Sequence, residues 1–140
     1  MRRPATAAGL LLAAAAHAGC GDTLPAAHRL LTDARPDAGG WQVAFAPSPA
    51  PLPAGRHVAL DIVVCPPPGA TPPAMLSVDA DMPAHRHGMN YRASVTALGG
   101  GRFRADGLMF HMAGRWRVIV DLPAADGAPA RRLTREIDLR

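Results

Sequence analysis

The chain of 140 residues is long enough for one compact domain and too short for two independent cores. Its formal net charge is +4, but every basic residue is an arginine and the arginines are spread along the chain. We therefore expect no nucleic-acid partner, because such proteins concentrate basic residues on one face. Aromatic residues make up only 4%, so the core must be built mainly from aliphatic and methionine side chains.

The first residues predict an export signal. A basic start, Met1–Arg3, precedes the apolar run Ala5–Ala16, and Ala16-His17-Ala18 has the small-x-small pattern of a cleavage site. The apolar run is too short to cross a bilayer, which needs about 20 helical residues. We therefore assign residues 1–20 to a signal peptide and expect the protein to be exported, either to the periplasm or to a membrane-anchored position.

Cys20 leaves two alternatives for the mature N-terminus. The string "AHAGC" is similar to the lipobox of bacterial lipoproteins, in which case Cys20 would carry a lipid anchor, and this is the interpretation we favour. Cleavage after Ala18 would instead leave Cys20 and Cys65 together in an oxidising compartment, where they could form a disulfide. Contact with the membrane is expected only through such an anchor.

Residues 21–38 are polar and weakly patterned, which predicts a tether with one helical turn at Ala26–Leu31. From Trp41 onward apolar residues alternate with polar ones, as in half-buried strands, and glycine or proline ends each run. We therefore assign 39–140 to one domain, an all-β antiparallel sandwich of about seven strands. After the strand that starts at Trp41, the predicted strands are 58–65, 74–82, 92–98, 103–105, 108–112, 115–122 and 133–139, with turns that include 106–107 and 113–114.

The stretch "MPAHRHGMNY" at 82–91 carries the side chains best suited to bind a metal. In an extended backbone His85, His87 and Met89 would share a face, because residues two apart point to the same side about 6.5–7 Å from one another. If the strand that ends at His111 and Met112 lies alongside, it would supply a further ligand.

The types of ligand atom favour copper, and Cu(I) above all, because imidazole and thioether groups are soft ligands. Zinc and Cu(II) stay open through Asp79 and Asp81 on the preceding strand. A structural interpretation also stays open, in which the methionines fill a core short of aromatics and the histidines hydrogen-bond a loop. The sequence has no phosphate-binding loop, nucleophile elbow or nucleophile–base pair, so we expect no enzyme.

The strings "VDADMPAHRHGMNY" at 78–91 and "GRFRADGLMFHMAGRW" at 101–116 resemble the YtkA-like family of small exported bacterial domains, which are close in style to FixH-type and copper-resistance β-sandwiches. The resemblance covers about residues 56–122. It implies an immunoglobulin-like sandwich and a setting near copper handling or respiratory-complex assembly. The positions that carry the motif are Met82, Pro83, His85, His87, Gly88, Met89, Phe110, Met112, Gly114 and Trp116.

The residues and the resemblance together predict a non-enzymatic, exported domain that stores, buffers or passes on copper. His85, His87 and Met89 would bind the ion, and His111 or Met112 would complete the site. A membrane protein or respiratory complex would then be the partner that receives the ion. The alternative is a metal-free, immunoglobulin-like interaction or assembly module for a membrane complex.

Overall fold

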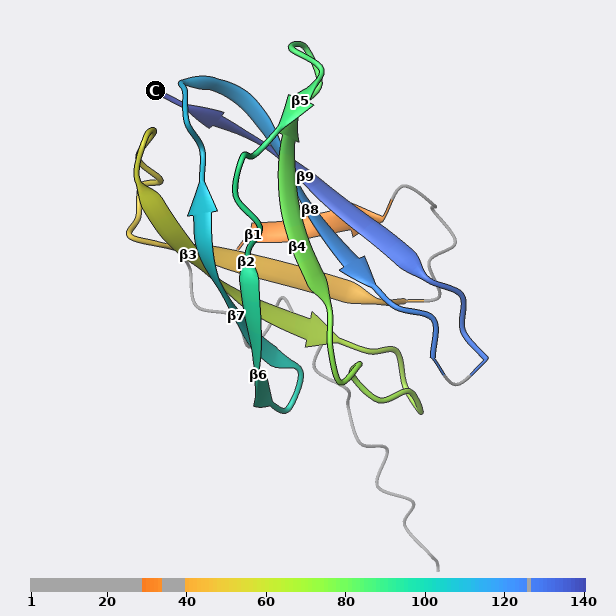
Figure 1. The fold of residues 1–140 in the computed structure, drawn as a ribbon. Helices are drawn as coiled ribbons and strands as arrows, with labels where there is room; N and C mark the ends of the chain where they lie inside the picture. Colours follow the sequence, from red (N-terminus) through yellow and green to blue (C-terminus); the bar gives the residue numbers. More distant parts are fainter. Residues whose placement is uncertain (1–28, 34–39, 126) are drawn as a thin grey trace, which may run out of the picture.

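A computed structural model describes residues 29–33, 40–125 and 127–140, and these form an all-β fold of two facing antiparallel sheets (Figure 1). One sheet has the order β5-β4-β8-β9 and the other β2-β3-β7-β6, and β1 pairs with both β9 and β2. The strands are β1 (Arg29–Asp33), β2 (Gln42–Ser48), β3 (His57–Cys65), β4 (Ser77–Met82), β5 (His87–Gly88), β6 (Ser94–Gly99), β7 (Arg102–Met109), β8 (Gly114–Leu122) and β9 (Arg131–Leu139). The predicted β-sandwich is confirmed.

The core lies between the sheets and is built from the inward-facing residues, which alternate with outward-facing ones along each strand. On β3 the side chains of Val58, Leu60, Ile62 and Val64 are buried, as the alternation predicted. On β8 the inward side chains are Trp116, Val118, Val120 and Leu122, also as predicted. Branched side chains suit the pleated surface of a strand, and each one that is fully buried stabilises the fold by about 1.5–3 kcal/mol.

Two of the predicted elements are wrong. Asp106-Gly107 is not a turn: β7 runs without interruption from Arg102 to Met109, and its pairing with β3 shifts register between Val58 and Leu60. The extra residue forms a β-bulge, and Gly107 has a φ of 83° there. Residues 29–33 were assigned to the tether, yet they form β1, so the helical turn predicted at Ala26–Leu31 is wrong for Arg29–Leu31; residues 26–28 lie outside the described part.

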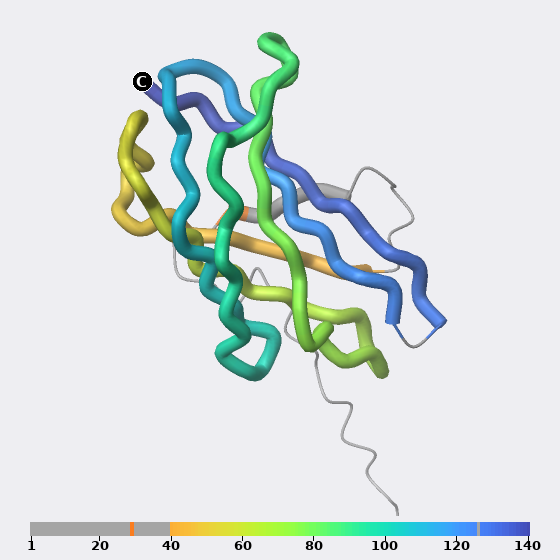
Figure 2. Tube along the Cα trace, viewed as in Figure 1, coloured from red at the N-terminus to blue at the C-terminus, as the bar shows by residue number. Residues whose placement is uncertain are grey.

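The two sheets bring distant segments together at one end of the sandwich. Figure 2 shows the β4–β5 hairpin and the connection from β7 to β8 reaching that same end. The strand β3 begins at this end of the sandwich, where His57 lies opposite Met109, and it ends at Cys65, at the opposite end. Within the described ranges, no helix is long and apolar enough to cross a membrane.

Gly101 and Gly100 give a matched test of the close packing between β3 and β7. Both have a positive φ, at 77° and 60°, so alanine at either position costs about 1 kcal/mol in backbone strain. A Cβ at Gly101 would also lie 2.4 Å from the Val64 carbonyl oxygen, whereas a Cβ at Gly100 would meet no atom within 4 Å. We expect Gly101→Ala to lower the free energy of unfolding clearly more than Gly100→Ala in urea denaturation. Equal losses would contradict this packing.

Candidate functional site: a histidine cluster at one end of the sandwich

The segment that carries the first two histidines is a tight hairpin. The backbone N–H groups of His85 and Arg86 both donate to the Met82 carbonyl oxygen, at 3.0 and 2.9 Å. Arg86 has a φ of 56°, the left-handed conformation that closes the loop before His87 pairs with Met82. The prediction that His85 lies on an extended strand with His87 is therefore wrong, because Pro83 ends β4 and the chain turns at once.

The hairpin nevertheless brings the predicted histidines together. The ring centroids of His85 and His87 lie 5.7 Å apart, and those of His87 and His111 lie 5.0 Å apart. The predicted strand 108–112 is wrong at its end, because β7 stops at Met109 and His111 lies in the connection between β7 and β8. The cluster thus joins the β4–β5 hairpin to the connection that links the two sheets. We call His85, His87 and His111 the histidine cluster.

The indole of Trp116 supports this cluster from the core. Trp116 is fully buried, and its ring makes edge contacts with Phe110 at 5.3 Å, His111 at 5.2 Å and His87 at 5.9 Å between centroids. Its Nε1–H donates to the Met112 carbonyl oxygen at 3.0 Å, which fixes the connection that carries His111. The alternation along 115–122 predicts Trp116 only as an inward residue of the core. Its contact with two histidines depends on the fold, and the sequence signal for it was the inward position of Trp116 on β8.

Two ring nitrogens of the cluster differ from those of an ordinary surface histidine. His87 Nδ1 lies 3.3 Å from the Gly88 carbonyl oxygen. In the tautomer that donates this hydrogen bond, Nε2 keeps its lone pair, which is the arrangement typical of a metal-binding histidine. His111 Nδ1 is buried and has no hydrogen-bond partner. Such an unpaired atom costs about 1–3 kcal/mol, so it calls for an explanation.

The methionines around the cluster differ in burial. Met89 packs against the core, and its N–H donates to the Ala80 carbonyl oxygen at 3.1 Å. Met82 is buried, and it lies so close to Gly114 that a Cβ there would be 2.8 Å from the Met82 Cε. Met112 is 37% exposed and directly follows His111 in the chain.

The geometry fits a site with two imidazoles better than one with three. Two imidazoles that bind one ion at about 2.0 Å place their ring centres on the order of 5 Å apart, as His87 and His111 are. Among the described residues, no group of three or more His, Cys, Asp or Glu side chains is arranged to hold a metal ion. Additional ligand atoms would therefore have to come from thioether sulfurs, which suits a soft ion and not zinc.

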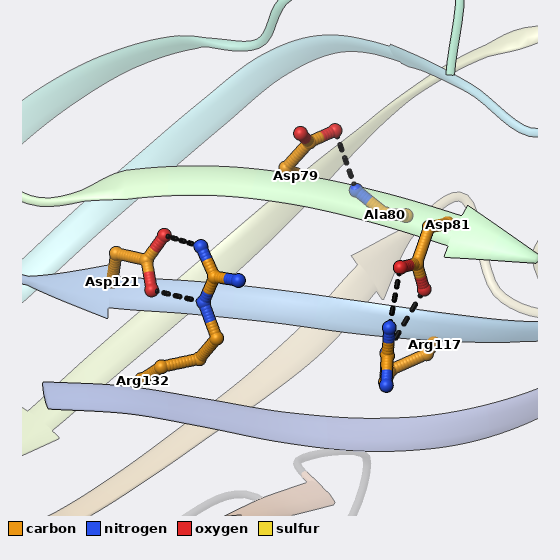
Figure 3. A network of polar contacts seen from close by, with 6 residues as sticks. All are labelled: Asp79, Ala80, Asp81, Arg117, Asp121 and Arg132. Carbon is orange, nitrogen blue, oxygen red and sulfur yellow. Dashed lines mark hydrogen bonds and ion pairs between the residues drawn. The ribbon is translucent and has the colours of Figure 1, made fainter. Parts of the chain in front are cut away.

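The two aspartates that kept zinc and Cu(II) open are engaged elsewhere. Asp81 accepts hydrogen bonds from both Arg117 Nε, at 2.9 Å, and Arg117 NH2, and Figure 3 shows the pair beside that of Asp121 with Arg132. The hydrogen bond to Asp81 raises the pKa of Arg117, so the arginine stays charged. Asp79 Oδ1 accepts the Ala80 N–H at 2.8 Å. Both aspartates alternate with the inward residues of β4, so they face away from the histidine cluster.

Trp116→Phe tests whether the indole holds the cluster in place. The variant removes the donor to Met112, and we expect a loss of about 1–3 kcal/mol in the free energy of unfolding. We also expect the NMR signals of the His87 and His111 rings to shift and broaden. Trp41→Phe is the control, because Trp41 is only partly buried and lies at the Cys65 end of the domain. Equal effects of the two variants would contradict this role of Trp116.

Comparison with known proteins agrees with the family resemblance seen in the sequence. The sequence model of the YtkA-like family matches residues 36–121, which is more than half of the chain. No curated protein and no solved structure matches the chain. The matched range contains β2 to β7, nearly all of β8, and every residue of the histidine cluster. The chain is a member of the YtkA-like family.

Proposed function

We propose that this domain binds copper, preferentially as Cu(I), through His87 and His111. The observation that carries the proposal is the buried His111 Nδ1, which has no hydrogen-bond partner and belongs to a ring 5.0 Å from that of His87. A metal ion would satisfy that nitrogen. The thioether of Met112 and the imidazole of His85 lie at the exposed rim, and Met89 lies deeper, against the core.

The chemistry of the surrounding groups supports a soft ion. Structural zinc sites usually have four Cys, His or carboxylate ligands, whereas Cu(I) accepts imidazole and thioether groups. The Trp116 ring contacts two histidines of the cluster, Met112 directly follows His111 in the chain, and Asp81 on β4 pairs with Arg117. When bound, the ion would contribute a positive charge that soft ligands stabilise, and the proposed role of the domain requires no chemical reaction at the ion.

The position of the site suggests exchange with a partner. His87 and His111 are half-buried, while His85 and Met112 are exposed beside them. A partner could therefore reach the ion from the rim without opening the core. The exported domain would then buffer copper or pass it to a membrane protein or respiratory complex.

A metal-free interaction module remains the second candidate function. The absence of a three-ligand group of His, Cys, Asp or Glu in the described residues favours it. In this alternative the β4–β5 hairpin, which extends beyond the sheets in Figure 1, would dock on a partner, and the histidines would only shape its surface.

Competitive titration with a Cu(I) chelator distinguishes the two candidates. We expect wild type to bind Cu(I), and His87→Ala/His111→Ala to bind it more than about tenfold more weakly, because even groups that only hydrogen-bond a metal ligand are worth about 10–100-fold in metal affinity. His57→Ala is the matched control, since His57 is exposed and its ring contacts Tyr91, outside the cluster. Equal binding by all three proteins would end the copper proposal.

Tryptophan fluorescence gives an independent measurement of where the ion binds. In a Trp41→Phe background only Trp116 emits, and its ring centroid lies 5.2 Å from His111 and 5.9 Å from His87. Copper bound at these imidazoles should quench that emission. Binding without any change in Trp116 emission would place the ion elsewhere.

The state of Cys65 bears on the compartment and the anchor. Cys65 is disulfide-bonded, and the only other cysteine in the sequence is Cys20, which lies outside the described residues. Because disulfides persist in oxidising compartments, this supports export.

We expect the mature protein, isolated without reductant, to show no thiol that reacts with a maleimide, and to show thiols after reduction. Intact mass spectrometry of the same sample measures whether Cys20 carries a lipid. A lipid-modified Cys20 together with a reactive Cys65 would contradict this expectation and support the lipoprotein.

A further inference from the structure

The strand β6 is the last strand of its sheet. Within the described ranges it pairs with β7 alone, from Ser94 opposite Asp106 to Gly99 opposite Arg102. Every second residue of an edge strand points its backbone N–H and C=O away from its neighbour. The outer side of β6 therefore offers hydrogen-bonding groups to another strand.

The edge of the facing sheet lies on the same open side of the sandwich and is closed by specific contacts. At β4, the Ala80 carbonyl oxygen accepts the Met89 N–H at 3.1 Å, and Asp79 Oδ1 accepts the Ala80 N–H at 2.8 Å (Figure 3). The aspartate thus occupies a backbone donor that an added strand would need, and it places a negative charge there. Charged side chains of this kind are a common protection of sheet edges against association.

The edge of β6 has no such protection. Its sequence, Ser94–Gly99, contains neither a charged residue nor a proline, so each residue has an N–H and no charge repels an incoming strand. Leu98 is 57% exposed, which leaves a large apolar side chain at this edge. The pairing of β6 with β7 is regular from Ser94 to Ala97, and its register shifts only at the end of the strand, between Ala97 and Gly99.

We propose that β6 pairs antiparallel with β6 of a second copy of this chain, so that two sheets join across a two-fold axis. Val95 and Ala97 lie opposite the buried Ala105 and Phe103, so Ser94, Thr96 and Leu98 face the other way. In an antiparallel register centred on Thr96, this residue lies opposite Thr96 of the second copy. Residues that face the same side of the sheet then meet across the axis.

The composition of β6 favours a second copy as the partner. Each chain carries a net charge of +4, but the paired strands themselves are uncharged, so like charges do not meet directly across the axis. The contact involves one short strand from each chain, well below the standard interface of about 1,600 Å². The dimer should therefore be weak and depend on concentration. This inference is independent of the copper proposal.

Sedimentation velocity of the metal-free domain over a concentration series tests the proposal. We expect wild type to shift from monomer to dimer as concentration rises, and Thr96→Lys to stay monomeric, because two lysines would meet at the axis. Ser77→Lys is the matched control: it places the same side chain at an exposed position of β4, which belongs to the other sheet and pairs with no strand of the second copy in the proposed dimer. This variant should dimerise as wild type does.

Amide hydrogen exchange locates the contact in the unmodified chain. The outward-pointing amides of β6 should exchange more slowly as the protein concentration rises, while those at the outer edge of β4 should not. Monomer at every concentration would overturn the proposal. So would a dimer that Thr96→Lys leaves intact, or one that Ser77→Lys weakens equally.

Discussion

Burial of the Trp116 indole at one end of the core is the interaction on which the candidate site depends. The ring contacts His87 from one segment and His111 from another, and its N–H holds the Met112 carbonyl oxygen between β7 and β8. A planar, rigid side chain can fix two neighbouring rings at little entropic cost of its own, because it has only two rotatable side-chain bonds. The cluster is thus positioned by the same packing that stabilises the fold.

The three imidazoles of the histidine cluster differ in exposure and in whether their nitrogens have hydrogen-bond partners. Of the three imidazoles, His87 has a backbone partner, His85 is exposed, and His111 has a buried nitrogen without a partner. A core selected for stability alone would fill that position with an apolar side chain of similar size, since an unpaired buried nitrogen stabilises nothing. Natural proteins keep such losses mainly at functional sites. His111 is therefore the residue of the cluster that a purely structural role explains least well.

The sequence predicted the features that depend on local pattern. The alternation on β3 and β8 identified the buried side chains, because period two is a property of the strand itself. The convergence of His87 and His111 was predicted only on the condition that their segments were neighbours, since sheet order is set by long-range pairing. Gly107 was misassigned because glycine with a positive φ occurs both in turns and in bulges. The strand β1 carries no clear alternation, and it is stabilised by neighbours distant in sequence.

The outer faces of the sheets help to explain why recognition would occur at the ends and edges of this domain. On one sheet Arg115, Arg117 and Arg132 pair with Asp138, Asp81 and Asp121, and on the other Arg104 pairs with Asp61 and Asp106. These partners raise the pKa of each of the four arginines, which therefore stay charged next to opposite charges. Each exposed pair contributes little to stability because solvent and salt screen it, but it neutralises the surface locally. The chain's excess of arginine over acidic residues thus creates no basic patch at these positions. The chemically distinctive surfaces are then the histidine cluster at one end and the uncharged edge of β6.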